Sequence, residues 1–201
     1  MTFPARRLKI CLAVLITGLA SNSANADAPQ LAADGWHTWR VTAAESASDW
    51  CCFQWNGGVA KQKSCDLDDR RSGYSNSNDR NTVVSEMQIY VLTSNGEPKK
   101  IRALNSQCHV TSESPIADLG FLETNDSVDW LQRHIDPHSK ISSDVMAAIS
   151  THEGERALSI LMAVVHKNSN IENKKDALFW LAMSDSDSAY EFLNRLLLVK
   201  N

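Results

Sequence analysis

The sequence has little surplus charge and few glycine or proline residues. Its 201 residues include 20 lysines and arginines against 24 aspartates and glutamates, giving a formal net charge of −4, with 8 glycines and 5 prolines. A general nucleic-acid binder normally has a basic surplus, so the charge balance argues against that class. Few glycines and prolines, together with 43% hydrophobic residues, exclude a collagen-like, low-complexity or wholly disordered chain.

The motifs of common enzyme classes are also missing. The chain contains no G-x-S-x-G, no glycine-rich phosphate loop and no H-E-x-x-H, and the histidines between residues 134 and 166 are too irregularly spaced for a zinc site. Asp66, Asp68 and Asp69 are not followed by the glycine and glutamate of an EF-hand, so they are interpreted as a solvated turn. We predict a non-enzymatic protein without a metal or cofactor.

The strongest apolar run lies near the N-terminus. Arg6, Arg7 and Lys9 precede an apolar stretch over 10–20, and Ala24-Asn25-Ala26 follows. This order is typical of a secretory signal peptide, and the run is short of the about 20 residues that a membrane span needs. We expect cleavage after Ala26, a periplasmic or secreted protein, and no stable membrane insertion after cleavage.

Four cysteines remain after the predicted cleavage: Cys51, Cys52, Cys65 and Cys108. An even number in an exported chain favours two structural disulfides over metal or redox chemistry. Neighbouring residues on a strand point to opposite faces, so a bond between the two adjacent cysteines is excluded. We prefer Cys51–Cys108 with Cys52–Cys65, and the crossed alternative stays open.

The region 27–115 has the pattern of a small disulfide-bonded β domain. Strands are expected at 36–42, 50–55, 83–92 and 100–104, and Asn95-Gly96 predicts a hairpin turn because both residues tolerate positive φ.

Four tryptophans fall in one stretch of 20 residues in this region: Trp36, Trp39, Trp50 and Trp55. We expect them to build a core around the disulfides; the alternative is a stacking platform for sugar rings. Trp36 and Trp39 are three positions apart, and because strand side chains alternate, they cannot share a face of one straight strand. This spacing suggests that one of them is exposed. That one would be a candidate binding residue.

The region 116–201 is expected to be helical throughout. Apolar residues recur at helical spacing near 127–135, 144–151, 155–167, 173–183 and 188–199. Ser127 and Ser143 are expected to cap the first two helices. Shifting the chain by 32 residues places Ile149 on Leu181 and Leu161 on Leu193, which suggests a repeated helix pair.

The second copy of this pair resembles a short HEAT repeat. A basic start, an Ala-Leu-Phe-Trp-Leu helix over 174–184, an acidic turn and a second apolar helix over 189–193 carry the resemblance, which covers about 141–198. Ser186 stands where many such turns have glycine. The resemblance implies a short α-solenoid, a fold used mainly for holding partners, and exported bacterial proteins with a Trp-Cys-Cys segment ahead of such helices look similar overall.

The expected fold class is therefore α+β, a small disulfide-bonded β domain followed by a HEAT-like helix-hairpin domain. The predicted function is an exported interaction protein that docks a protein partner; the alternative is a glycan or small-ligand module that uses the tryptophans. Phe179 and Phe192 cannot both join Leu181 and Leu193 on one narrow stripe. Whichever ring lies outside is expected to mark the docking surface.

Overall fold

The computed structural model describes residues 29, 31, 33–47, 49–57, 59–69, 75–76 and 84–198. The predicted signal peptide over 1–26 lies outside the described residues, as does the side chain of Trp55. None of the described helices is long and apolar enough to cross a membrane.

A four-stranded sheet forms the centre of the β region, in the order β7-β6-β1-β9. Its strands are β1 (Gly35–Thr42), β6 (Glu86–Ser94), β7 (Glu97–Asn105) and β9 (Ile116–Phe121). The predicted hairpin is confirmed: β6 and β7 are antiparallel, and Asn95 and Gly96 both have positive φ at the turn between them. β1 is antiparallel to β6 and parallel to β9.

The strand β9 corrects the sequence-based prediction, because it lies at the start of the 116–201 region where only helices were expected. Its sequence gave no strand signal because most of its side chains are exposed or half-buried at the edge of the sheet.

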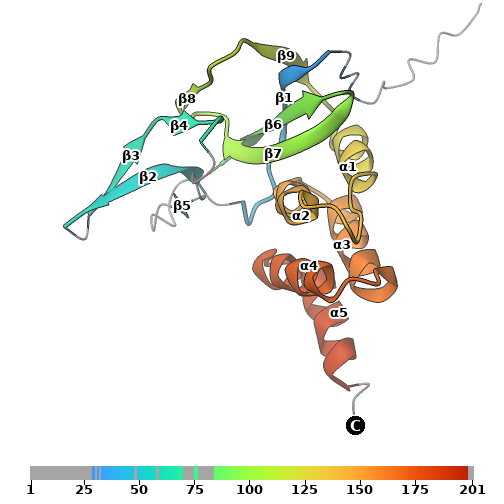
Figure 1. The fold of residues 1–201 in the computed structure, drawn as a ribbon. Coiled ribbons are helices and arrows are strands. Elements are labelled where there is room, and N and C mark those ends of the chain that lie inside the picture. Colours follow the sequence, from blue (N-terminus) through green and yellow to red (C-terminus); the bar gives the residue numbers. More distant parts are fainter. Residues whose placement is uncertain are drawn as a thin grey trace, which may run out of the picture.

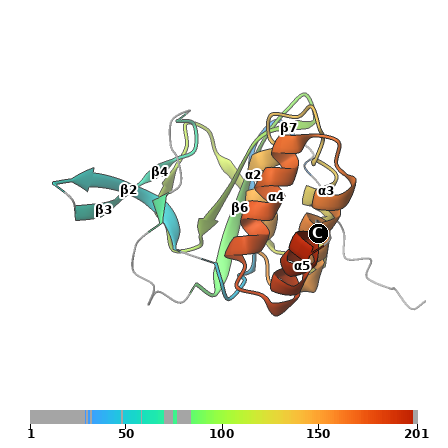
Figure 2. The same cartoon turned by 90° about the horizontal axis from the view of Figure 1, so that it is seen from below.

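A β-hairpin projects from this sheet and is called here the β2–β3 arm. It consists of β2 (Trp50–Asn56) and β3 (Val59–Lys63), and the short β5 (Ser75–Asn76) pairs with the base of β2. A separate parallel pair is formed by β4 (Cys65–Asp66) and β8 (Val110–Thr111). Figures 1 and 2 both show the arm extending away from the sheet and from the helices.

Two disulfides cross-link the base of the arm with the preferred pairing. Cys51 is bonded to Cys108 across a Cα–Cα distance of 5.6 Å, and Cys52 is bonded to Cys65 across 5.2 Å. The first bond ties β2 to the loop after β7, and the second joins β2 to β4. The adjacent cysteines therefore reach two different parts of the fold, as alternation along a strand requires.

Five helices follow in the described residues: α1 (Thr124–Gln132), α2 (Ser142–Ser150), α3 (Glu155–Lys167), α4 (Ile171–Met183) and α5 (Asp187–Leu198). Asn170 caps α4, because its side chain accepts hydrogen bonds from the amides of Glu172 and Asn173. The two predicted serine caps are wrong. α1 begins before Ser127 and α2 before Ser143, and neither helix has a side-chain cap bond.

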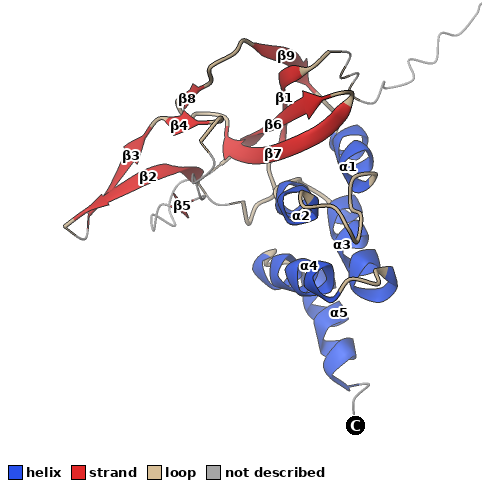
Figure 3. Cartoon of the chain, in the orientation of Figure 1, coloured by secondary structure: helices blue, strands red, loops and turns tan. Residues whose placement is uncertain are grey.

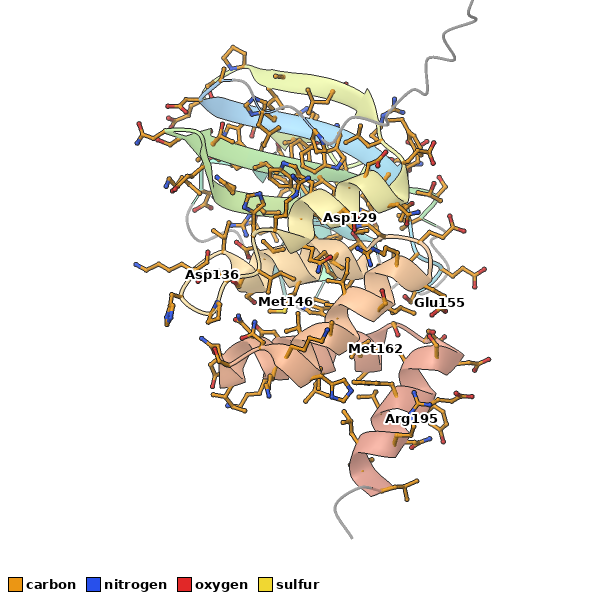
Figure 4. All side chains as sticks on the ribbon, turned by 90° about the vertical axis from the view of Figure 1, so that its right-hand side faces the viewer. Asp129, Asp136, Met146, Glu155, Met162 and Arg195 are labelled. Atoms are coloured by element: carbon orange, nitrogen blue, oxygen red, sulfur yellow. A yellow bond between two sulfur atoms is a disulfide. The ribbon has the colours of Figure 1, made fainter. Side chains whose placement is uncertain are left out.

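The helices gather on one side of the sheet and descend from it in layers (Figures 3 and 4). In Figure 4, Met146 of α2, Met162 of α3 and Arg195 of α5 follow one another away from the strands. One hydrophobic cluster runs without a break from the sheet through all five helices, with Trp39, Met146 and Leu181 among its members.

A second, smaller cluster lies on the other face of the sheet. It contains Trp36, Tyr90 and Leu104 from the strands, together with Leu67 and the bridge between Cys52 and Cys65. The fold is α+β, with a disulfide-linked β region and C-terminal helices that share a core with its main sheet.

Candidate functional site

Both tryptophans of β1 are core residues, which corrects the prediction that one of them is exposed. They do point to opposite faces of the strand, as their spacing predicts, but each face is covered: Trp36 is 1% exposed and Trp39 is 0% exposed. Trp36 packs in the disulfide cluster and Trp39 lies under the helices. Neither ring can therefore serve as a stacking platform for a sugar.

The acidic turn after Cys65 is an anchoring point for the indole of Trp36. Asp68 Oδ1 accepts a hydrogen bond from Trp36 Nε1 at 2.9 Å, and Oδ2 accepts from the Glu113 amide at 2.6 Å and from Ser112 Oγ at 3.1 Å. These donors, first of all the Glu113 amide, lower the pKa of Asp68 below its usual value. The carboxylate thus ties the 65–69 segment to β1 and to the loop before β9.

A buried polar chain joins β1, α1 and α2. Trp39 Nε1 donates to Ser127 Oγ at 2.7 Å, Ser127 Oγ lies 2.8 Å from His152 Nε2, and His152 Nδ1 lies 2.8 Å from the carbonyl oxygen of Ala148. A carbonyl only accepts, so Nδ1 carries the proton and Nε2 accepts from the serine hydroxyl. Burial lowers the pKa of His152 to about 4, which keeps the ring neutral in this chain.

The Ser127–His152 pair has the contact of an activated nucleophile but lacks access. Ser127 is fully buried, and His152 is buried beside it. A substrate atom has no path to the serine hydroxyl while α1 is packed against β1, so the pair holds the layers together.

One group of metal-ligand residue types also lies together in the described part of the chain. Asp49 is close to the sulfur atoms of Cys51 and Cys108. The two sulfurs are bonded to each other and are not thiolates, the form in which cysteine binds metals. Asn105 Nδ2 donates to Asp49 Oδ1 at 2.7 Å, so this carboxylate helps to position the loop after β7.

Exposed apolar side chains concentrate on the last two helices. Six of the seven large exposed hydrophobic residues in the described part belong to α4 and α5: Ile171, Phe179, Met183, Tyr190, Leu197 and Leu198. Phe192 is buried and packs edge-on against His166, with ring centroids 5.1 Å apart, whereas Phe179 is 54% exposed. Of the two phenylalanines, Phe179 is the one left outside.

Phe179 is part of an aromatic surface that crosses from α4 to the β region. Its ring lies 4.8 Å from that of Trp180, and the Trp180 ring lies 5.3 Å from that of Trp50 at the start of β2. Met183 follows Phe179 by one helical turn and is also exposed. These four residues, Trp50, Phe179, Trp180 and Met183, are called here the aromatic face.

Only part of this surface could be predicted from the sequence. The exposed position of Phe179 follows from helical periodicity, because Asn173, Ala177 and Leu181 occupy the buried side of α4. Trp180 lies beside that buried side, which could have marked it as half-exposed. Its contact with Trp50 joins residues far apart in the chain, and periodicity carries no signal for such a pair.

Comparison with known proteins adds no relative to this description. No protein-family model, curated protein or solved structure matches the chain.

Proposed function

We propose that the chain is an exported, periplasmic, non-enzymatic interaction protein that docks a protein partner on the aromatic face. The observation that carries the proposal is the exposure of Phe179, stacked edge-on against Trp180 and continued by Met183. Apolar surface of this kind is costly to leave in water, and aromatic side chains and methionine are enriched where proteins meet.

The packing around the aromatic face supports a docking role. Trp180 packs against the core that α4 shares with α2 and α3, and its ring also contacts the ring of Trp50. Trp50 precedes Cys51, whose disulfide fixes the base of β2. A surface that is ordered before binding loses little conformational entropy when a partner arrives, and a partner segment with an apolar side chain fits it.

Export is supported by the two disulfides together with the charged, apolar and small-residue order of the first 26 residues. The helical region's resemblance to short HEAT repeats favours partner binding over catalysis. Intact mass of exported material is expected to give a chain that begins at Asp27. A mature protein that retains residues 1–26 would overturn the proposed localisation.

Site-specific photo-crosslinking in the native host tests the docking surface. A photoreactive amino acid in place of Phe179 is expected to give one discrete protein adduct in the periplasm. Phe121 on β9 provides the matched control, because it is also an exposed phenylalanine but lies on another element. The same adduct at both positions, or none at Phe179, would contradict the proposal.

A binding measurement with the captured protein completes the test. The purified partner is expected to bind the wild-type chain and to lose affinity for Phe179→Ser, while Phe121→Ser binds as the wild type does. Equal affinity for all three would show that the adduct reports proximity alone and would overturn the aromatic face as the docking site.

A further inference from the structure

A groove lies between α4 and α5, on the side of α4 away from the aromatic face. Its volume is about 240 Å³, and its lining includes Leu181 and Ala182 from α4, Tyr190 and Leu193 from α5, and Asp185 and Asp187 at the turn. Helical spacing continues the apolar rows of the groove beyond its lining on both helices. Leu178 precedes Ala182 by four residues, and Leu197 follows Leu193 by four.

The groove is apolar in its middle and strongly exposed on the α5 side. Tyr190 is 66% exposed and Leu197 is 73% exposed, although both lie next to Leu193, which packs against the core. On the inner side of the same helix pair, Ala177 of α4 and Ala189 of α5 are covered by the neighbouring helices. One side of the pair is thus packed, and the groove side presents apolar side chains to solvent.

Charges at the two ends of this apolar surface have opposite sign. Lys174 lies on the same row of α4 as Leu178 and Ala182, four residues before Leu178. Asp185 and Asp187 lie at the turn, at the other end of the groove. The acidic residues Glu172 and Asp176 fall on the opposite row of α4, toward the aromatic face.

We propose that a second copy of this chain occupies the groove, with its own α4–α5 pair packed antiparallel across a twofold axis. A surface that is positive at one end and negative at the other is complementary to itself after a twofold rotation. Lys174 of each copy then faces the turn of the other copy, and the apolar middle of one groove covers that of the other. The inference goes beyond the proposed function, because it uses a different side of α4.

Sedimentation velocity of the purified mature protein over a wide concentration range tests this assembly. The wild-type chain is expected to form a reversible dimer. Leu197→Asp is expected to be monomeric with an unchanged fold, because its side chain is largely exposed in the single copy. A monomer at every concentration, a larger assembly, or a dimer that tolerates Leu197→Asp would overturn the proposal.

Charge reversal identifies the geometry of the dimer. Lys174→Glu and Asp187→Lys are each expected to weaken self-association by roughly tenfold, because each reversal acts at two symmetric contacts. An equal mixture of the two variants restores opposite charges at both contacts and is expected to dimerise about as well as the wild type. A mixture as weak as either variant alone would exclude the antiparallel arrangement.

Two matched controls separate this inference from the proposed function. Lys63→Glu makes the same charge change at an exposed lysine of β3 and is expected to leave the dimer unchanged. Phe179→Ser is expected to lose the docked partner and keep the dimer, whereas Leu197→Asp is expected to do the reverse. Loss of the dimer in Phe179→Ser would show that the two surfaces are one and would overturn this inference.

Discussion

The buried ring of His152 makes the stability of the fold depend on pH. Burial lowers its pKa from the usual 6.5 to about 4. Between these values the unfolded chain holds a proton that the folded chain does not, so the free energy of unfolding rises with pH. At about 1.36 kcal/mol per pKa unit, the full contribution is about 3 kcal/mol, present above pH 6.5 and lost as the pH falls to about 4.

Urea unfolding at a series of pH values between 7 and 4 measures this contribution, with His152→Gln as the reference that does not titrate there. The variant is expected to be less stable at pH 7, because it disturbs the buried chain of hydrogen bonds from Trp39 to Ala148. The quantity to compare is the fall in the free energy of unfolding between pH 7 and pH 4 in each protein. Wild-type stability is expected to fall by about 3 kcal/mol more than that of the variant over this range.

Other titrating groups are present in both proteins and cancel in the comparison. Burial raises the pKa of Asp144, which makes its contribution opposite in sign, and burial lowers the pKa of His134, which makes its contribution the same in sign. Parallel pH dependences for the wild type and His152→Gln would refute the argument. So would an NMR titration that places the folded-state pKa of His152 near 6.5.

Three other perturbations give expected outcomes from the same structure. Ser127→Ala leaves a buried indole N–H and a buried imidazole without their partner and is expected to cost about 1–3 kcal/mol for each group in urea unfolding. Cys108→Ser opens a bridge that spans 57 residues and is expected to remove roughly 4 kcal/mol, whereas the oxidised wild type is expected to show no free thiol on alkylation. Leu181→Ala is expected to lower the free energy of unfolding by about 2–5 kcal/mol, because the side chain is fully buried. The control Lys175→Ala, at an exposed position, is expected to lower it by less than about 0.5 kcal/mol. Equal losses in the two variants would contradict the packing of α4.

The sequence predicted those parts of the fold that depend on local signals. The turn at Asn95-Gly96 requires positive φ, the five helices follow from apolar periodicity, and strand alternation separates Cys51 from Cys52. β9 escaped prediction because it is an edge strand that pairs with β1 from a distant part of the chain.

The candidate site was predicted less completely for the same reason. Ser127 has the residue type of a helix cap, but its hydroxyl accepts from Trp39, 88 residues away, and its place inside α1 follows from that long-range contact. The spacing of Trp36 and Trp39 correctly predicted opposite faces of β1. It could not indicate that both faces are covered, since that depends on how the sheet meets the helices and the disulfide cluster.

The two disulfides also determine how the chain survives proteolysis. The Cys52–Cys65 loop is nested within the Cys51–Cys108 loop. A single cut at any peptide bond between residues 52 and 107 therefore leaves both fragments covalently joined, and a nicked molecule migrates as one species until it is reduced. In an oxidising compartment that contains proteases, the β2–β3 arm can be cleaved at its tip and still remain attached to the fold on both sides of the cut.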